Sequence, residues 1–327
     1  MSSSTSSSVS ISLPENRVVL GVGITSVDFL AAVASYPNPD DKIRTTSFKV
    51  QGGGNVGNAL TSAARHTRTC ILTPGSPPMV PDDLSRSSLL SALNGARIVY
   101  SDVGLHEIAL LVAREAARQN IPMLIDAERK KEGVDDLLAF ASYVVCSTKF
   151  PQAKTLFNGQ EWTEAPSIPS ALLSMLLRYP KLRFVIVTLG ENGCIMLERN
   201  IDETPDQMEE FEVDNLLEVV KSRRDENINV PTFVSSPVAK LRAEGIGTVC
   251  GRLLLGTAEK IPESEIVDTT GAGDAFVGAV LYALCANMPP ENLLPFSAQV
   301  AARCCRALGA RTGLPYRTDP RLASFLH

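Results

Sequence analysis

The clearest chemical pattern in this 327-residue chain is the run Val267-Asp268-Thr269-Thr270-Gly271-Ala272-Gly273-Asp274. It predicts the end of a strand, a tight glycine turn and then a helix over 274–286. The glycines leave backbone N–H groups bare at the positive end of that helix, which suits an anion. Asp274 lies in the first turn, where a carboxylate could take a proton from a hydroxyl about to attack phosphorus. The alternative is a structural turn in which Asp274 only complements the helix dipole. Aspartate on both sides of the glycines favours chemistry.

Other polar residues follow predicted strands in the same way. Asp28 comes after the strand Val18–Gly23, and a loop with the sequence Gly52-Gly53-Gly54-Asn55-Val56-Gly57-Asn58 comes next. The amides of Asn55 and Asn58 offer both donors and acceptors, which suits hydroxyl groups. The run Thr188-Leu189-Gly190-Glu191-Asn192-Gly193 again leads from a strand into a glycine turn, which lets backbone approach a phosphate. A turn carboxylate at Asp28 and a flexible turn at Asn55 are the structural alternatives.

Composition excludes several classes of function. A net charge of −5 argues against a broad nucleic-acid or membrane surface. No apolar run approaches the roughly 20 residues that span a bilayer. The seven cysteines form no CxxC pair and have no histidine at ligand spacing, so no metal ligand set is predicted. None of the three histidines has a recognisable catalytic context, which assigns proton chemistry to carboxylates.

Three regions are expected along the chain. Residues 1–16 are predicted to be a disordered serine-rich tail. This composition is partly typical of a plastid transit peptide, but the stretch is short and lacks arginine before Arg17, which favours a cytoplasmic location. Residues 17–327 form the predicted folded domain. Within it, the acidic and then proline-rich segment 199–247 is expected to be a surface insertion, mostly flexible, with a helix over 214–221.

The folded part alternates short apolar runs with helical periodicity. This order predicts a parallel sheet covered by helices on both faces, with ligands at the carboxyl ends of its strands. The expected strands are 18–23, 97–100, 122–126, 143–146 and 184–188, and the expected helices are 58–65, 107–119, 134–141, 171–177, 274–286 and 291–308.

Taken in order, Asp28, the 52–58 loop, Thr188–Gly193 and the Asp268–Asp274 run resemble the motifs of the ribokinase-like (PfkB) carbohydrate kinases. The resemblance covers nearly the whole chain outside the tail and the insertion. It implies an α/β, three-layer ribokinase-like fold with a mainly parallel central sheet, helices on both faces and a small β lid. It also implies a kinase that moves the ATP γ-phosphoryl to a hydroxymethyl group of a sugar or sugar-like acceptor.

The resemblance also implies a role for each matching residue. Asp274 would be the base, and the N–H groups of Gly271, Ala272 and Gly273 would form the anion hole. The acceptor hydroxyls would be held by Asp28, Gly54, Asn55 and Asn58. The nucleotide would lie against Thr188, Gly190 and Gly193. Magnesium would arrive with ATP, and a monovalent cation such as K⁺ often supports this anion hole in the family.

The chain departs from the family pattern in two places. Where an Asn-x-x-Glu motif is expected, the sequence has Ser147-Thr148-Lys149-Phe150. After the helix near 58–65, the chain passes directly into residues 66–72. In relatives, a strand, a Gly-x-Asp-x-x-Gly helix and lid strands lie between these points. An internal deletion near 65–68 is therefore expected to remove an interior strand and leave the lid incomplete. Lid-strand homodimers are common in the family, and an incomplete lid argues against one here.

Two functions remain open. The first is a kinase that acts on a ketose, a pentose or a nucleoside, because aspartate and asparagine recognise hydroxyls in general. The second is a catalytically weak or inactive nucleotide-binding isoform that lacks part of the acceptor site and lid. A Rossmann dehydrogenase is excluded, because no G-x-G-x-x-G with a following acidic residue comes after the first strand.

Overall fold

The computed structural model describes most of the chain. The predicted tail 1–16, the join at 65–67 and the first part of the predicted insertion lie outside the described residues. Those described are 18–33, 44–64, 68–72, 79–128, 133–150, 156–157, 160–161, 165–200 and 208–326.

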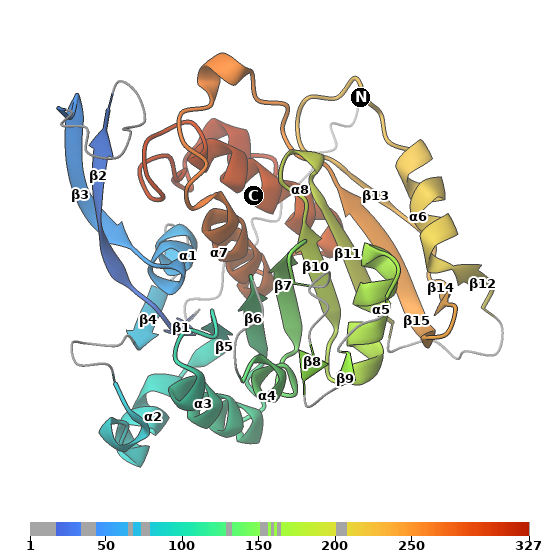
Figure 1. Ribbon diagram of the computed structural model, residues 1–327, viewed down its shortest axis with the longest axis horizontal. Coiled ribbons are helices and arrows are strands. Elements are labelled where there is room, and N and C mark those ends of the chain that lie inside the picture. The colour runs from blue at the N-terminus through green and yellow to red at the C-terminus, as the bar shows by residue number, and fades with distance from the viewer. Residues whose placement is uncertain are drawn as a thin grey trace, which may run out of the picture.

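The described residues form an α/β structure in which helices cover both faces of a large central sheet (Figure 1). Its strands are β1 (Val18–Val22), β2 (Ser26–Ala32), β3 (Ser47–Gly53), β4 (Arg68–Leu72), β5 (Ala96–Ser101), β6 (Met123–Ala127), β7 (Tyr143–Ser147), β8 (Leu156–Phe157), β9 (Gln160–Glu161), β10 (Phe184–Thr188), β11 (Cys194–Arg199), β12 (Glu210–Glu212), β13 (Phe233–Ser235), β14 (Ala239–Ala243) and β15 (Gly247–Gly256). Its helices are α1 (Asn55–Ala64), α2 (Arg86–Leu93), α3 (His106–Arg118), α4 (Val134–Leu138), α5 (Ile168–Arg178), α6 (Val213–Ser222), α7 (Ala272–Cys285) and α8 (Pro290–Cys304).

The central sheet is parallel over one part and antiparallel over the other. The strand order is β12-β14-β15-β11-β10-β7-β6-β5-β1-β4, and β13 pairs with β15. The strands from β4 to β10 are parallel to their neighbours, as predicted. β10 and β11 are antiparallel because only the short turn 189–193 joins them, and such a turn can only reverse the chain. All five strands expected from the apolar runs are present.

Side-chain alternation along the strands builds two cores, one on each face of the sheet. In β10, Val185 and Val187 point to one core while Phe184 and Ile186 point to the other. α2 to α6 pack on the first face, and α1, α7 and α8 pack on the second. The three-layer architecture follows, because strands that are apolar on both faces need helices on both sides.

A separate two-stranded sheet of β2 and β3 projects from one end of the central sheet, at the left in Figure 1. The two strands are antiparallel, and Asp28 pairs with Gln51 across them. We call this sheet the lid. Its outer face exposes four large apolar side chains, and the rings of Phe29 and Phe48 stack at a centroid distance of 6.2 Å. These exposed side chains are Val27, Phe29, Phe48 and Val50.

The region of the expected deletion contains a strand. β4 is parallel to β1, which therefore lies between β4 and β5. β4 ends the strand order and is an edge strand, so the expected loss of an interior strand stays a prediction. The lid has two strands among the described residues.

The segment expected to be a mostly flexible insertion differs from that expectation over its described part. Residues 208–247 supply β12, β13, β14 and α6, and β14 pairs with β15 over five residues from Ala239 to Ala243. The apolar side of α6 is buried against the sheet. Sequence composition underestimated this segment, because the apolar residues that anchor it are spaced among charged and proline-rich stretches. The helix expected over 214–221 is present as α6.

Helices α1 and α7 lie against each other across a glycine. A Cβ at Gly278 would lie 2.3 Å from the carbonyl oxygen of Ala59 on α1. One turn earlier on α7, the carbonyl of Ala275 accepts a 3.1 Å hydrogen bond from the hydroxyl of Ser62. Only glycine permits this backbone approach, which is the contact that brings the start of α1 to the start of α7.

In the part of the chain that the structure describes, no helix combines the length and apolar character that a membrane crossing requires.

Substitution of Gly278 by Val should therefore destabilise the fold, because the added methyl groups would force α1 away from α7. We expect a loss of about 1–3 kcal/mol in the free energy of unfolding, measured by urea denaturation. Arg114→Val on the exposed side of α3 is the control and should change stability by less than about 0.5 kcal/mol. An equal effect of the two substitutions would show that the α1–α7 contact can accommodate a larger side chain at position 278.

Candidate active site

A cavity of about 470 Å³ opens at the carboxyl ends of the parallel strands. Contributions come from the lid, the start of α1, the ends of β6, β7 and β10, and the glycine turn before α7. The predicted residues that line it are Asp28, Gly54, Asn55, Asn58, Thr188, Gly271, Gly273 and Asp274. The fold thus gathers side chains from widely separated parts of the sequence into one polar site. We call it the acceptor cavity.

The glycine turn is held in place from two sides. The carboxylate of Asp268 accepts hydrogen bonds from the N–H of Thr270 at 2.9 Å and from the N–H of Gly309 at 2.7 Å. These bonds hold the pKa of Asp268 below its ordinary value. Gly271 then turns the chain with φ +76°, a conformation that side-chain-bearing residues rarely adopt.

Two of the three backbone N–H groups of the predicted anion hole are available. Among the described residues, the N–H groups of Gly271 and Gly273 have no hydrogen-bond acceptor. The N–H of Ala272 instead donates to the carbonyl of Thr269 at 3.2 Å. The two available groups lie on the wall of the acceptor cavity, at the positive end of the 14-residue helix α7.

Asp274 is half-buried beside these N–H groups, and its carboxylate accepts a 2.9 Å hydrogen bond from Nδ2 of Asn58. Burial raises the pKa of Asp274 to about 6; the Asn58 bond and the Arg311 charge oppose this rise, while Glu128 and Asp102 add to it. A carboxylate with this pKa is ionised at neutral pH and is a stronger base than an ordinary aspartate.

A second acid lies deeper in the same cavity. Asp126, at the end of β6, accepts a 3.2 Å hydrogen bond from the hydroxyl of Tyr100. Burial, followed by the charges of Asp274, Asp102 and Glu128, raises the pKa of Asp126 to about 8. Asp126 is therefore mostly protonated at neutral pH when the cavity holds no cation.

A second cavity, of about 400 Å³, adjoins the first, and Thr188 and Gly273 line both. Gly190 and Gly193 lie on its wall, as the sequence predicted for a nucleotide site. The remaining wall is largely apolar and is suited to a planar ring. Its apolar side chains are Ile261, Ile266, Phe276, Ala298, Ala301 and Ala302.

Sequence reasoning missed four charged residues of the site. Asp102, Asp126 and Glu128 surround Asp274 electrostatically, and Arg311 donates from Nε to Oδ1 of Asn58 at 2.8 Å. Asp126 carries the same signal that identified Asp28, a carboxylate at the carboxyl end of a predicted strand. No sequence pattern identifies Arg311, because it lies in the loop that follows α8 and reaches the site only through the tertiary fold.

Comparisons with known proteins find similarity to sugar kinases. Residues 255–317, which include the glycine turn, α7 and α8, match the pfkB family carbohydrate kinase profile. Ketohexokinase from Mus musculus is 22% identical over 304 residues, which cover 90% of this chain and 98% of that protein. The matched segment is thus similar to the pfkB family carbohydrate kinases, and the chain as a whole is similar to a ketohexokinase.

Other pfkB relatives match over a shorter segment or by fold alone. Ribokinase from Mus musculus is 39% identical over 83 residues, and the match covers 23% of this chain and 26% of that protein. The crystal structure of ribokinase from Thermotoga maritima aligns with a TM-score of 0.64 and 18% identity, covering 95% of this chain and 99% of that one. This alignment confirms the predicted ribokinase-like fold.

The raised pKa of Asp274 predicts a pH-dependent cost to stability. An aspartate with a folded-state pKa near 6 and an ordinary unfolded value stabilises the fold when protonated, and this stability is lost as pH rises to about 6. Asp274→Asn removes the charge and keeps the shape, so it should be more stable than the wild type at pH 8 by about 1–3 kcal/mol. The difference should shrink towards pH 4, as measured by urea unfolding. A constant difference across this range would contradict the assignment.

Proposed function

We propose that this chain is an ATP-dependent kinase that transfers the γ-phosphoryl group to a hydroxymethyl group of a sugar-like acceptor. One observation carries the proposal. A half-buried carboxylate with a raised pKa and two available N–H groups lie where a polar cavity meets a cavity with a largely apolar wall. This junction is where a phosphoryl group would pass from nucleotide to acceptor.

Asp274 acts as the base in this proposal. The acceptor hydroxyl attacks the γ-phosphorus, its proton passes to the Asp274 carboxylate, and the bond from phosphorus to the β,γ-bridging oxygen of ATP breaks. The products are the phosphorylated acceptor and ADP. The N–H groups of Gly271 and Gly273 stabilise negative charge on the transferring group. The third predicted donor, Ala272, would have to exchange its bond to Thr269 for one to the phosphate.

The acceptor is held by the lid side of the cavity. Asp28 points from β2 into the cavity and receives a 3.0 Å hydrogen bond from Ser26. Asn55 donates from Nδ2 to Glu128 at 3.3 Å, which leaves its carbonyl available for a hydroxyl. Asn58 already bonds both Asp274 and Arg311, so its contribution is to hold the base more than to bind sugar.

ATP enters from the cavity with the largely apolar wall. Its adenine packs among those apolar side chains, and its phosphates run past Gly190, Gly193 and Thr188 towards the glycine turn. Magnesium carried by ATP neutralises phosphate charge during transfer. Asp126 and Glu128 line the acceptor cavity and are the oxygen donors that this ion prefers, so they would hold it in place of the absent Asn-x-x-Glu motif. K⁺ beside the anion hole stays a prediction.

The incomplete lid argues against a homodimer, but one feature of the lid favours it. The exposed apolar side chains on the outer face of the lid form a surface that a second copy could cover, and such patches on stable monomers are generally small. The two-stranded lid is sufficient to present this face. A second copy would bury Phe29 and Phe48 without altering the inner face that carries Asp28.

Measurement of ADP release from Mg-ATP with a panel of ketoses, pentoses and nucleosides tests the kinase proposal. Asp274→Asn should lower kcat by about a hundredfold or more, because the proton acceptor is lost. Asp82→Asn, at an exposed position before α2, is the matched control and should retain wild-type kcat.

The alternative is a nucleotide-binding isoform with little or no activity, as a lid reduced to two strands would permit. Turnover no faster than that of Asp274→Asn with every acceptor would contradict the kinase proposal. If ATP nevertheless raised the melting temperature in a concentration-dependent manner, the binding isoform would be the correct description. Absence of both turnover and stabilisation by ATP would contradict both functions.

A further inference from the structure

Arg311 connects three parts of the candidate site that are far apart in sequence. It lies in the loop that follows α8, and its guanidinium is half-buried. Nε donates to Oδ1 of Asn58 at 2.8 Å, and one terminal nitrogen donates to the carbonyl of Gly53 at 3.0 Å. Its charge also acts on Asp28 and Asp274. A single rigid fork thus contacts the start of α1 and the end of the lid strand β3.

The bond from Arg311 determines which way the amide of Asn58 faces. Arginine can only donate, so the group that it contacts on Asn58 must be the carbonyl oxygen. The NH₂ group of Asn58 is then directed at Asp274, to which it donates at 2.9 Å. Without Arg311 the amide could turn over and present its oxygen to the Asp274 carboxylate, which would repel it.

The same loop is tied to the lid. The hydroxyl of Thr312, the next residue, donates to Oε1 of Gln51 at 3.3 Å and accepts a hydrogen bond from Lys49, both on β3. Gly309 donates to Asp268 in the glycine turn. Residues 309–312 therefore bond the lid, α1 and the turn that precedes the base.

We propose that Arg311 is a positioning residue for phosphoryl transfer, which holds the Asn58 amide towards Asp274 and fixes the base of the lid to α1. This inference rests on the proposed function, because it assigns Arg311 a part in the same reaction. Arg311 is not among the residues that line the acceptor cavity, so it acts through Asn58 and Gly53 and not by contact with the reacting atoms.

The groups that face Asp274 set the sign of the expected pH effect. Carboxylates at 102, 126 and 128, the phenol of Tyr100 and the thiol of Cys304 act on it from the strands and from α8, and Arg311 is the one cation among the groups that the structure shows acting on it. Removing Arg311 takes away that cation and the orientation of Asn58 together. Both changes make protonation of Asp274 easier, so the acidic limb of activity must move to higher pH.

A double-mutant cycle between Arg311→Met and Asn58→Ala tests whether Arg311 acts through Asn58. Arg311→Met should lower kcat by about tenfold while the KM for ATP stays unchanged, since the nucleotide cavity lies on the other side of the glycine turn. The double variant should have a kcat within about twofold of Asn58→Ala alone. Multiplication of the two losses would overturn the proposal, as would full recovery of kcat by Arg311→Lys, which keeps the charge without the fork.

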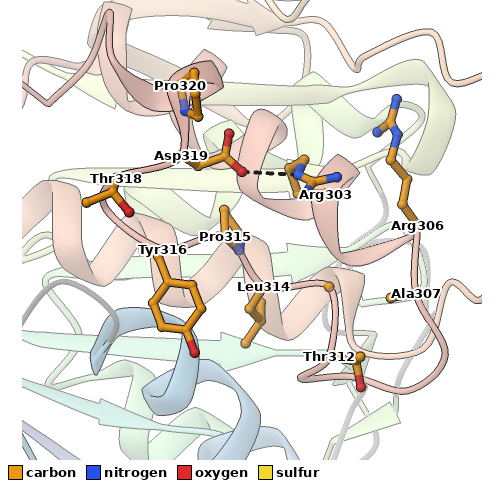
Figure 2. A pocket seen from close by; sticks show the side chains of 11 residues that line it. Arg303, Arg306, Ala307, Thr312, Leu314, Pro315, Tyr316, Thr318, Asp319 and Pro320 are labelled. Carbon is orange, nitrogen blue, oxygen red and sulfur yellow. Dashed lines mark hydrogen bonds and ion pairs between the residues drawn. The ribbon is translucent and has the colours of Figure 1, made fainter.

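Arg303→Met is the matched control. Arg303 lies on α8, eight positions earlier, and its Nε contacts Asp319 at 3.3 Å on the wall of a separate cavity of about 380 Å³ (Figure 2). It makes no recorded contact with Asn58 or Asp274. Arg303 and Arg311 are both partly exposed. Removal of the Arg303–Asp319 pair should therefore leave kcat and the pH profile at their wild-type values.

A measurement that needs no turnover separates this inference from the proposed function. The difference in unfolding free energy between Asp274 and Asp274→Asn forms follows the ionisation of Asp274, with a midpoint near pH 6 in the wild-type background. In the Arg311→Met background the midpoint should rise by about half a pH unit or more. A rise in this midpoint without any kinase activity would support the role of Arg311 and contradict the kinase proposal. Kinase activity with an unchanged midpoint would support the kinase proposal and contradict the role of Arg311.

Discussion

The site depends on the hydrogen bond between Asn58 on α1 and Asp274 on α7. This bond can form only because the two helices approach closely at Gly278, one turn beyond Asp274. The same contact joins the lid to the glycine turn, because α1 begins directly after β3 and α7 begins directly after that turn. A movement of either helix would separate Asp274 from Asn58 and change the pKa of Asp274 at the same time.

Four carboxylates surround the cavity in which, in the proposed function, a negatively charged phosphate must bind. Asp274, Asp126, Asp102 and Glu128 lie around one cavity, and burial with mutual repulsion raises the pKa values of the first two. Such crowding is unfavourable for stability in the free protein. In the proposed function, a cation bound with the phosphate would relieve this repulsion. The burial and repulsion that destabilise the fold are thus the same interactions that would make Asp274 a stronger base in the proposed function.

The loop 309–312 connects the lid to the turn before Asp274. Asp268 fixes the glycine turn to the N–H of Gly309, and Arg311 fixes Asn58 and Gly53. These bonds link the loop after α8 to elements near the start of the described chain. A lid of two strands can therefore be held in register with the site by polar contacts at its base, and the exposed apolar side chains of its outer face remain outside the cavity.

The sequence alone determined the fold class and most of the site, because both depend on local patterns. Apolar runs of four to six residues define the parallel strands, and glycines with adjacent aspartates define the turn before α7. Polar residues at strand ends must meet at one edge of a parallel sheet, so Asp28, Asn55, Asn58 and Thr188 could be assigned together.

Only the tertiary structure decided the electrostatics and the support of the site. The pKa values of Asp274 and Asp126 depend on burial and on charges more than a hundred residues away. Arg311 is invisible to sequence patterns, because its partners at positions 53 and 58 come within reach only after the chain folds back on itself. The described part of segment 199–247 joins the sheet for the same reason: pairing with β15 satisfies its backbone, which composition cannot reveal.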